Sequence, residues 1–355
     1  MATQTIDEAK LGAFMERVLG DAAGLMASTL ATLGDRLELF KALADRPATS
    51  AELAAATDVN ERYAREWLHG MHAAGYVELE RDTRRYALPA EHAQVLAAEG
   101  GPAFLGGAFQ LTFGYLRTIE RLTEAFRSGG GVPQSAYPAD TWEGMGRFSR
   151  SFYDNLLVQQ WLPMVESLPA RLQEGVRWAD VGCGSGIAVI RLAEAFPAST
   201  FVGYDNFEGQ LQLARRAAAV AGLGDRVRFE LLDGGTGLPE TFDVISTFDV
   251  VHDAGDPGAL LAAIRRALAP GGTYLMLEMS SADDPDDNVG PLATLMYGIS
   301  VVYCMTTSLA HGGAGLGTCG LPPARVHELC READFGSVRQ LDLQDPFNRL
   351  YEIRP

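Results

Sequence analysis

The chain has 355 residues, of which 47 % are hydrophobic and 21 % charged, and this length accommodates two ordinary globular domains. Its formal net charge of −17 at pH 7 disfavours nucleic acids and anionic membranes, so a small molecule is the expected partner. No apolar run reaches the roughly 18 residues of a membrane span, and the start, MATQTIDEAK, lacks the features of a secretory signal.

Residues 1–90 are predicted to form a winged-helix domain. Apolar residues recur at helical spacing between residues 30 and 40, and a later stretch places Ala64, Trp67 and Leu68 on one helical face. The sequence YVELERDTRRYALP then alternates like two short strands around a charged turn. Three helices followed by a β-hairpin are the elements of a winged helix.

Residues 91–172 are predicted to form a helical linker that contributes to a substrate pocket. The glycines and prolines of RSGGGVPQSAYPAD interrupt the helical pattern with a loop. Aromatic residues recur in the helical stretch that follows, and we expect some of them to cover the active site: Phe148, Phe152, Tyr153 and Trp161.

Residues 173–355 change to strands that alternate with amphipathic helices, which predicts an α/β domain with a largely parallel sheet. The expected strands are Val176–Val181, Thr200–Asp205, Arg226–Leu232, Phe242–Thr247 and Thr273–Met279, with LAPGG as the turn into the fifth. SVRQLDL and RLYEIR are expected to pair as an antiparallel hairpin. An insertion occupies about 280–321, and its Met296, Tyr297 and Tyr303 suit either a pocket wall or the core of a helix.

The first of these strands runs into a glycine-rich turn, Asp180-Val181-Gly182-Cys183-Gly184-Ser185-Gly186. A phosphate-binding P-loop would end in Gly-Lys-Ser/Thr, and no lysine is present here; the dinucleotide fingerprint fails because Ile187 replaces its third glycine. Closely spaced glycines let the backbone approach a ligand. An aspartate beside them would repel a pyrophosphate but suits an ammonium group. The turn therefore favours S-adenosylmethionine, with Asp180 near its amino-acid end.

Two further acidic residues follow the next strands in the positions that such a cofactor needs. Asp205 ends the second strand, where it is placed to accept hydrogen bonds from both ribose hydroxyls. Asp233, followed by Gly234, ends the third, where a carboxylate can accept from the adenine amino group. The alternative is that both aspartates merely cap helices or belong to loops.

In order and spacing, these motifs resemble class I S-adenosylmethionine-dependent methyltransferases. The whole chain looks like the mycobacterial and actinobacterial methyltransferases that carry an N-terminal winged helix, through stretches such as DVGCGSG, FDVVHDAGDP and LMYGISVVYC. The resemblance implies a Rossmann-like, seven-stranded sheet in the order 3-2-1-4-5-7-6. It also implies S-adenosylmethionine as cofactor, bound by Asp180, Gly182, Gly184, Asp205, Asp233 and Gly234.

His252 and Asp253 follow the fourth strand, whose carboxyl end faces the ligand in open α/β sheets. A histidine near neutral pKa can take a proton from a hydroxyl or amine acceptor, and an adjacent carboxylate can orient it. Small-molecule O-methyltransferases of similar architecture carry a His-Asp-Trp motif here whose histidine is the catalytic base, whereas this chain has Ala254 in place of the tryptophan. The alternative is that both residues cap the helix that begins at Asp256-Pro257.

The winged helix also raises the alternative of a cofactor-sensing transcriptional regulator. DNA binding requires a basic face, but residues 1–90 contain ten Lys or Arg and fourteen Asp or Glu, a net charge of −4. In the resembling O-methyltransferases this domain mediates dimerisation, which predicts a homodimer.

Four cysteines without Cys-x-x-Cys spacing argue against a zinc site and suit the cytoplasm, and no carboxylate cluster suggests a metal. We expect a cytoplasmic enzyme that methylates a small aromatic or hydrophobic metabolite. Protein and nucleic-acid acceptors are minor alternatives.

Overall fold

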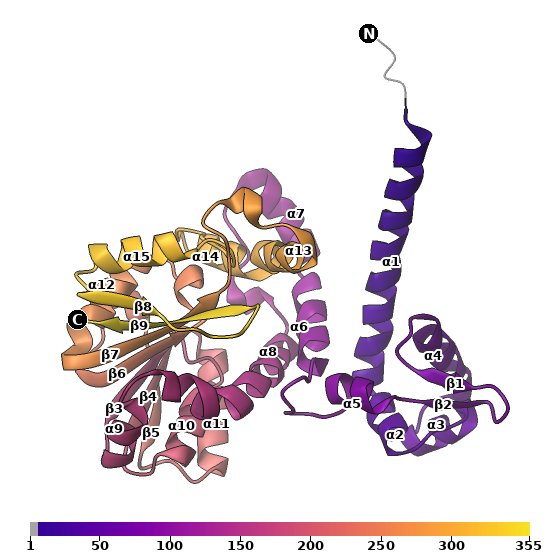
Figure 1. The fold of residues 1–355 in the computed structure, drawn as a ribbon, viewed down its shortest axis with the longest axis horizontal. Helices are drawn as coiled ribbons and strands as arrows, with labels where there is room; N and C mark the ends of the chain where they lie inside the picture. The colour runs from indigo at the N-terminus through magenta and orange to yellow at the C-terminus, as the bar shows by residue number, and fades with distance from the viewer. Residues whose placement is uncertain (1–5) are drawn as a thin grey trace. The chain divides into compact units, whose positions relative to one another are not determined.

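The computed structural model describes residues 6–355, which form two compact units that divide between Phe113 and Gly114 (Figure 1). The elements of the first unit are α1 (Glu8–Arg36), α2 (Leu39–Asp45), α3 (Ser50–Thr57), α4 (Glu61–Ala73), β1 (Glu78–Glu80), β2 (Arg85–Ala87) and α5 (Ala90–Leu96). A further helix, α6 (Gly106–Leu116), contains the point of division.

The first unit is a winged helix, as predicted. β1 and β2 pair antiparallel after the short helices, and the apolar face of α4 packs with α2 around Phe40, Trp67 and Leu68. The ring of Trp67 lies 5.1 Å from that of Phe40, and its Nε1 donates to the carbonyl of Leu30 at 2.8 Å. The amino-terminal part of α1, by contrast, is exposed on every side from residue 8 to residue 26.

The second unit begins with helices that precede its sheet: α7 (Ile119–Ser128), α8 (Ala139–Phe152), a π-helical segment (Tyr153–Trp161) and α9 (Leu168–Glu174). A π-helix of this length is unusual, and such segments occur often at functional sites. Leu157 and Trp161 of this segment are buried against the sheet.

The sheet of the second unit has seven strands in the order β5-β4-β3-β6-β7-β9-β8. Their bounds are β3 (Arg177–Val181), β4 (Thr200–Asp205), β5 (Val227–Leu231), β6 (Phe242–Phe248), β7 (Leu268–Met279), β8 (Ser337–Gln340) and β9 (Asn348–Arg354). The first five in the chain run parallel, and β9 pairs antiparallel with β7 and β8. This confirms the predicted order 3-2-1-4-5-7-6.

The predicted turn LAPGG is instead part of β7. The strand already pairs with β6 at Leu268, opposite Phe242, and the register shifts before pairing resumes at Thr273 opposite Val244. Residues 269–272 are therefore an irregularity inside the strand, and Gly271 takes the left-handed φ of 73° that such a bulge requires.

Helices cover both faces of the sheet (Figure 1). Packed on one face are α9, α10 (Ile187–Ala195), α11 (Glu208–Val220) and the π-helical segment; on the other are α12 (Pro257–Ala267) and α15 (Pro323–Glu332). Because the parallel strands share a direction, the carboxyl ends of β3 to β7 meet at one edge, where ligands of open α/β sheets bind.

The predicted insertion forms α13 (Gly290–Ile299), a π-helical turn and α14 (Met305–Ala310). Together they make the one helix among residues 6–355 that is long and apolar enough to cross a membrane, Gly290–Ala310. Core helices of soluble proteins meet the same criterion. This helix bonds to the rest of its unit: Tyr137 donates to the carbonyl of Val302 at 2.6 Å, and the amide of Val132 donates to Thr306 Oγ1 at 2.9 Å.

Candidate active site

The glycine turn after β3 lies at the carboxyl edge of the sheet, and each of its glycines has a positive φ. At Gly182, with φ of 75°, a Cβ atom would lie 2.5 Å from a methyl group of Val250. At Gly184, with φ of 54°, no described atom lies within 4 Å of where a Cβ would be. Gly182 is thus required by packing, whereas Gly184 leaves its surface open to a ligand.

Asp205, at the end of β4, is brought against this turn. One carboxylate oxygen accepts from the amide of Gly184 at 2.9 Å, and the other accepts from the amide of Phe207 at the same distance. Burial raises the pKa of Asp205, and the two backbone donors partly counter that rise. The predicted cofactor residues Gly184 and Asp205 are therefore direct neighbours, and the carboxylate already fixes the turn.

Asp180 lies deeper than a residue that meets a ligand directly. Its side chain is on β3 with the residue 2 % exposed, and Oδ1 accepts from the hydroxyl of Ser246 on β6 at 2.6 Å. Ser246 in turn accepts from the indole of Trp178 at 2.8 Å. Burial raises the pKa of Asp180 to about 7, against the lowering effect of Ser246. The structure thus gives Asp180 a role in joining two strands below the turn, and its contact with the cofactor stays a prediction.

Asp233 and Gly234 lie beyond β5 in a short 3₁₀ turn. Asp233 is exposed, and its Oδ1 accepts from the amide of Gly235 at 3.0 Å. Gly234 is buried, and a Cβ atom there would lie 2.6 Å from Val181 and 2.8 Å from Leu260. Asp233 is accessible to a ligand, while Gly234 allows the turn to approach β3.

His252 follows β6 in a 3₁₀ turn and is 2 % exposed. Its Nδ1 lies 2.6 Å from Glu278 Oε2, and its Nε2 lies 3.3 Å from Asp253 Oδ1. The other oxygen of Glu278 accepts from the amide of Val251 at 2.7 Å. Burial alone would lower the pKa of His252, but the facing carboxylates of Asp253 and Glu278 outweigh it and raise that pKa well above its usual value. The imidazole is therefore held between two carboxylates.

Glu278 is the residue that the sequence analysis missed. It lies in the middle of the apolar run TYLMLEM of β7, and it is 1 % exposed. A charged residue is almost never fully buried unless it is paired, so a lone glutamate within a buried strand is a signal that a partner exists. The partner itself, 26 residues away in the chain, could not be read from the sequence.

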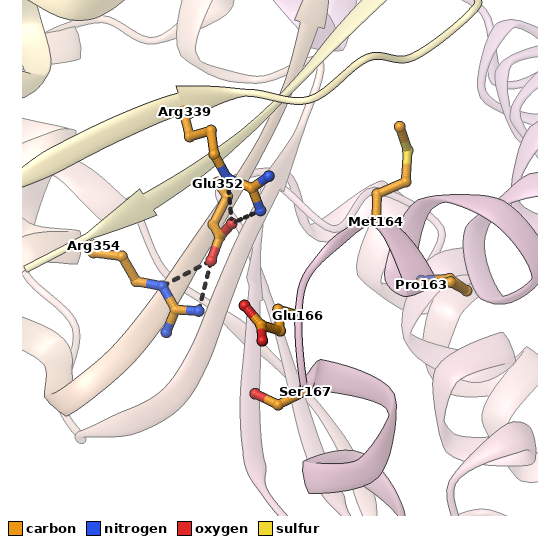
Figure 2. Close-up of a pocket in the computed structure, with 7 residues that line it drawn as sticks. All are labelled: Pro163, Met164, Glu166, Ser167, Arg339, Glu352 and Arg354. Carbon is orange, nitrogen blue, oxygen red and sulfur yellow. Dashed lines mark hydrogen bonds and ion pairs between the residues drawn. The ribbon is translucent and has the colours of Figure 1, made fainter.

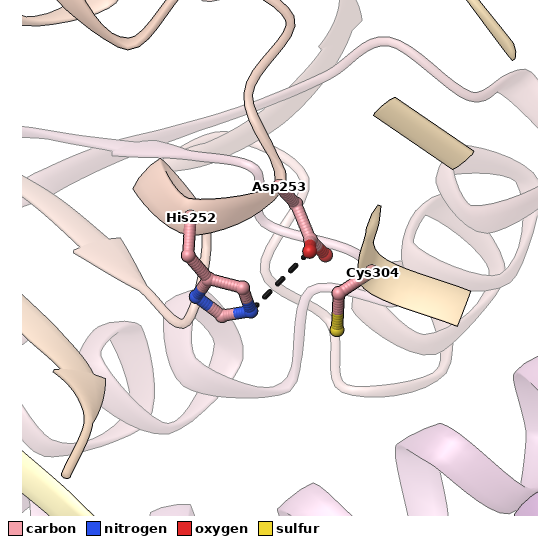
Figure 3. A group of neighbouring side chains, drawn as sticks. All are labelled: His252, Asp253 and Cys304. Carbon is pink, nitrogen blue, oxygen red and sulfur yellow. Dashed lines mark ion pairs between the residues drawn. The ribbon is translucent and has the colours of Figure 1, made fainter. Parts of the chain in front are cut away.

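Figure 3 shows Asp253 and Cys304 beside His252. The thiol of Cys304 lies within 4.8 Å of ligand atoms of both neighbours, and burial raises its pKa to about 11. Among the residues that the structure describes, these three side chains are the one group of His, Cys and acidic residues close enough to share a metal ion. Because the ion pair of His252 with Asp253 already accounts for the proximity of these two, we assign no metal to the group.

The helix α12 has its own cap. The carboxylate of Asp256 accepts from the amide of Ala259 at 2.8 Å, and Pro257 occupies the first turn. The alternative interpretation, in which His252 and Asp253 cap this helix, is therefore wrong.

Aromatic residues gather at the same edge. The four predicted to cover the site line one cavity of about 50 Å³, together with Asp249, Asn348 and residues at the end of β7. Of the residues in the insertion, Tyr303 is 6 % exposed and stacks on Tyr115 with a ring separation of 4.8 Å, Met296 is buried, and Tyr297 is exposed.

A larger hollow of about 620 Å³ lies elsewhere (Figure 2). Arg339 and Arg354 line it, and both form ion pairs with Glu352 on β9. Glu352 is opposite Leu275, in the part of β7 before its carboxyl end. Its two arginines are thus already neutralised in part, and the hollow is set back from the strand ends that carry His252 and Asp205.

Comparisons with known proteins agree with this geometry. The family model described as Rv2258c-like winged HTH domain matches residues 23–98, and the one described as methyltransferase domain matches residues 172–304. A ubiquinone biosynthesis O-methyltransferase of Dinoroseobacter shibae is 35 % identical over 102 residues, which are 29 % of this chain and 40 % of that protein. The chain spans between 24 % and 60 % of the length of the first curated relatives that it matches.

Solved structures show the same fold over the whole chain. The mitomycin 7-O-methyltransferase MmcR has a TM-score of 0.72 at 19 % identity, covering 98 % of this chain and 99 % of its own. Human N-acetylserotonin methyltransferase, solved with S-adenosylmethionine, has a TM-score of 0.70 at 18 % identity, covering 99 % of each chain. The chain thus has a winged helix-turn-helix domain followed by a methyltransferase domain.

Proposed function

We propose that this chain, a class I S-adenosylmethionine-dependent methyltransferase by its domains and fold, transfers a methyl group to a small-molecule acceptor. The observation that carries the proposal is the meeting of two features at one sheet edge. The open glycine turn with Asp205 suits the cofactor, and His252, held between Glu278 and Asp253, suits removal of a proton from the acceptor.

The residues that would hold the cofactor follow three neighbouring strands, β3, β4 and β5. From β3 to β5 they would meet its amino-acid end, its ribose and its adenine in turn. Gly184 leaves the backbone open to the cofactor, and Gly182 lets the turn pack against Val250 beneath it. Asp205 would accept from the ribose and Asp233 from the adenine. Gly234 allows close packing below, and Asp180 would act on the amino-acid end through water. When bound, the cofactor supplies an activated methyl group on its sulfonium.

The chain's own contribution to the chemistry is to position the acceptor and to receive its proton. His252 is the base in this proposal, and Glu278 keeps Nδ1 occupied so that Nε2 is the reactive nitrogen. The side chain of His252 is 3 % exposed and that of Asp253 is 27 % exposed. We therefore place Asp253 between the acceptor and His252, where it passes the proton inward.

The acceptor proposed is a small aromatic or hydrophobic metabolite. The buried aromatic cluster of Tyr115, Tyr303 and their neighbours, together with the cavity under the π-helical segment, supports a planar or apolar molecule. Three of the similar proteins have names that agree with this class, since they refer to ubiquinone biosynthesis, mitomycin and N-acetylserotonin. Another, a trans-aconitate 2-methyltransferase, is named for a polar acid.

The experiment that tests this function uses S-adenosylmethionine labelled in its methyl group and a size-fractionated extract of the source cells. We expect label to appear in a small-molecule fraction with the wild type, and clearly less of it with Asp205→Ala when the cofactor concentration is limiting. Label only in protein or nucleic acid would contradict the proposed acceptor class. Cofactor binding without transfer into any fraction would favour the regulator, which the winged helix-turn-helix match supports.

We propose that the enzyme is a cytoplasmic homodimer formed through α1. Exposed apolar side chains recur along the helix at the spacing of a single stripe: Leu11, Phe14, Met15, Val18 and Leu19. A stripe of this kind on an otherwise unsupported helix is typical of a helix that packs on another copy. Light scattering should give twice the mass of the chain for the wild type and for Arg17→Glu, and the single mass for Phe14→Glu/Val18→Glu. A monomeric wild type would refute the dimer.

A further inference from the structure

Asp249 is the first residue after β6, three positions before His252, and its backbone is left-handed with φ of 57°. Aspartate tolerates this conformation better than most residues. The turn leaves Asp249 among the residues that line the cavity under the π-helical segment. Its side chain takes no part in the methyl transfer proposed above.

Only one of the two carboxylate oxygens of Asp249 accepts a hydrogen bond within the described residues. Oδ1 accepts from the side-chain amide of Asn348 at 2.8 Å, which fixes the orientation of the group. Among residues 6–355 this is the one hydrogen bond that the carboxylate makes, and Asp249 is half-buried, so Oδ2 remains available to a ligand.

The other residues that line the cavity are uncharged, and five of these nine are aromatic. Phe148 and Phe152 meet edge to face at a ring separation of 5.2 Å, and Tyr153 and Trp161 do so at 6.2 Å. Asp249 is the one charged residue that lines the cavity within the described chain. Aromatic faces and a single carboxylate together attract a cation, because the ring quadrupoles and the carboxylate act in the same sense.

The charged groups near Asp249 also favour a bound cation. The groups that act on Asp249 are the carboxylates of Glu278 and Asp253 and the imidazole of His252. When His252 is protonated, its single positive charge is outnumbered by the three carboxylates of Asp249, Glu278 and Asp253 in their ionised form. The surroundings of the cavity are then net negative. Burial first and Glu278 second raise the pKa of Asp249 to about 7, and a bound cation would restore its ionised form.

We propose that this cavity binds the ammonium group of the methyl acceptor, which makes the substrate an amine-bearing aromatic or hydrophobic metabolite. The cavity's volume of about 50 Å³ suits this size, since a single water needs roughly 10–15 Å³. An ammonium group with its first carbon atoms fits, and the apolar body of the acceptor would extend toward His252. This inference rests on the proposed methyl transfer and names its substrate class.

The cofactor also carries an ammonium group, so its amino-acid end is the competing occupant. The glycine turn, Asp205 and Asp233 follow β3, β4 and β5. The cavity is instead lined by α8, the π-helical segment and the neighbouring ends of β6, β7 and β9. His252 and Glu278 belong to this second half of the sheet. This arrangement favours the methyl acceptor, rather than the cofactor, as the molecule whose ammonium group occupies the cavity.

The test measures binding without turnover, so it is independent of whether a substrate has been found. The full-length protein is saturated with S-adenosylhomocysteine and titrated with 2-phenylethylamine or its neutral analogue 2-phenylethanol. We expect the wild type to prefer the amine by about tenfold or more, and Asp249→Asn to lose that preference. Amine affinity should also rise as the pH increases through about 7 in the wild type and not in the variant.

Asp334→Asn is the matched control, because Asp334 is an exposed aspartate that also has a left-handed backbone, with φ of 60°. It should keep the preference for the amine. If Asp249→Asn fails to fold, Asp249→Gly removes the carboxylate while suiting the same φ. Equal binding of amine and alcohol to the wild type, or a preference that survives in both Asp249 variants, would refute the subsite.

A second arm separates the two sources of ammonium. If Asp249→Asn weakens S-adenosylhomocysteine but not 5′-methylthioadenosine, which lacks the amino-acid end, the cavity serves the cofactor and the acceptor assignment is wrong. Unchanged affinity for both nucleosides, with loss of amine binding, supports the proposal. Failure of methyl transfer by the wild type would contradict the proposed function and leave this binding result intact.

Discussion

The two halves of the sheet's carboxyl edge are built on different principles. On β3 and β4 the site is made largely of backbone: glycines with positive φ and a carboxylate that accepts from amides of the turn. On β6 and β7 it is made of buried charges, with His252 between Glu278 and Asp253. The first half suits recognition of a fixed cofactor. The second suits proton transfer, because buried charges of opposite sign next to one another shift the pKa of His252.

The largest effect is expected in the charged half. His252→Ala should lower kcat by about 10²–10⁴-fold if His252 is the general base, and it should leave cofactor affinity nearly unchanged. The measurement is label transfer alongside calorimetry with S-adenosylhomocysteine. A fully active variant would remove His252 from the chemistry.

In the backbone half, Asp205→Ala should weaken cofactor binding by about 1.5–3 kcal/mol, the scale of hydrogen bonds to a charged group. Part of that loss would come from the turn itself, since Asp205 accepts from the amide of Gly184. Calorimetry measures the change, and His252→Ala is its control. Unchanged affinity would exclude Asp205 from the ribose site.

Glu278→Gln tests the charged half of the site through the pH dependence of methyl transfer. The carboxylate of Glu278 raises the pKa of His252, and a base must be neutral to act, so activity should increase with pH in the wild type. Removing the negative charge lowers that pKa, and the acidic limb of the pH–rate profile should move to lower pH. The plateau should also fall, because Nδ1 loses its charged partner. An unshifted limb with a normal plateau would show that Glu278 does not act on the base.

The smallest effect is expected at Asp256, which caps α12 close to the charged cluster. Asp256→Ala should lower the free energy of unfolding by about 0.5–2 kcal/mol and leave methyl transfer nearly intact. Urea denaturation and the transfer assay measure the two effects. A loss of activity as large as that of His252→Ala would mean that the position of the helix, rather than the histidine itself, controls the reaction.

Most of the fold and half of the site follow from local patterns. The strand that ends at Val181 and the glycines after it are consecutive in the chain, so their geometry depends on neighbours that the sequence displays. The charged half differs. Glu278 reaches His252 across 26 residues, and Asn348 reaches Asp249 across 99, through pairings of β6, β7 and β9 that no short motif records.

The sequence by itself determined the two domain types and the class of cofactor, because helical and strand periodicity and glycine requirements are local properties. The strand order followed from the resemblance to class I methyltransferases and not from local periodicity. Only the tertiary structure decided which charges meet. It joined Asp180 to Ser246 beneath the turn, enclosed His252 between two carboxylates, and placed Asp249 in the lining of a cavity rich in aromatic residues. Burial and distance set the strength of electrostatic interactions, and both exist only once the strands have been packed together.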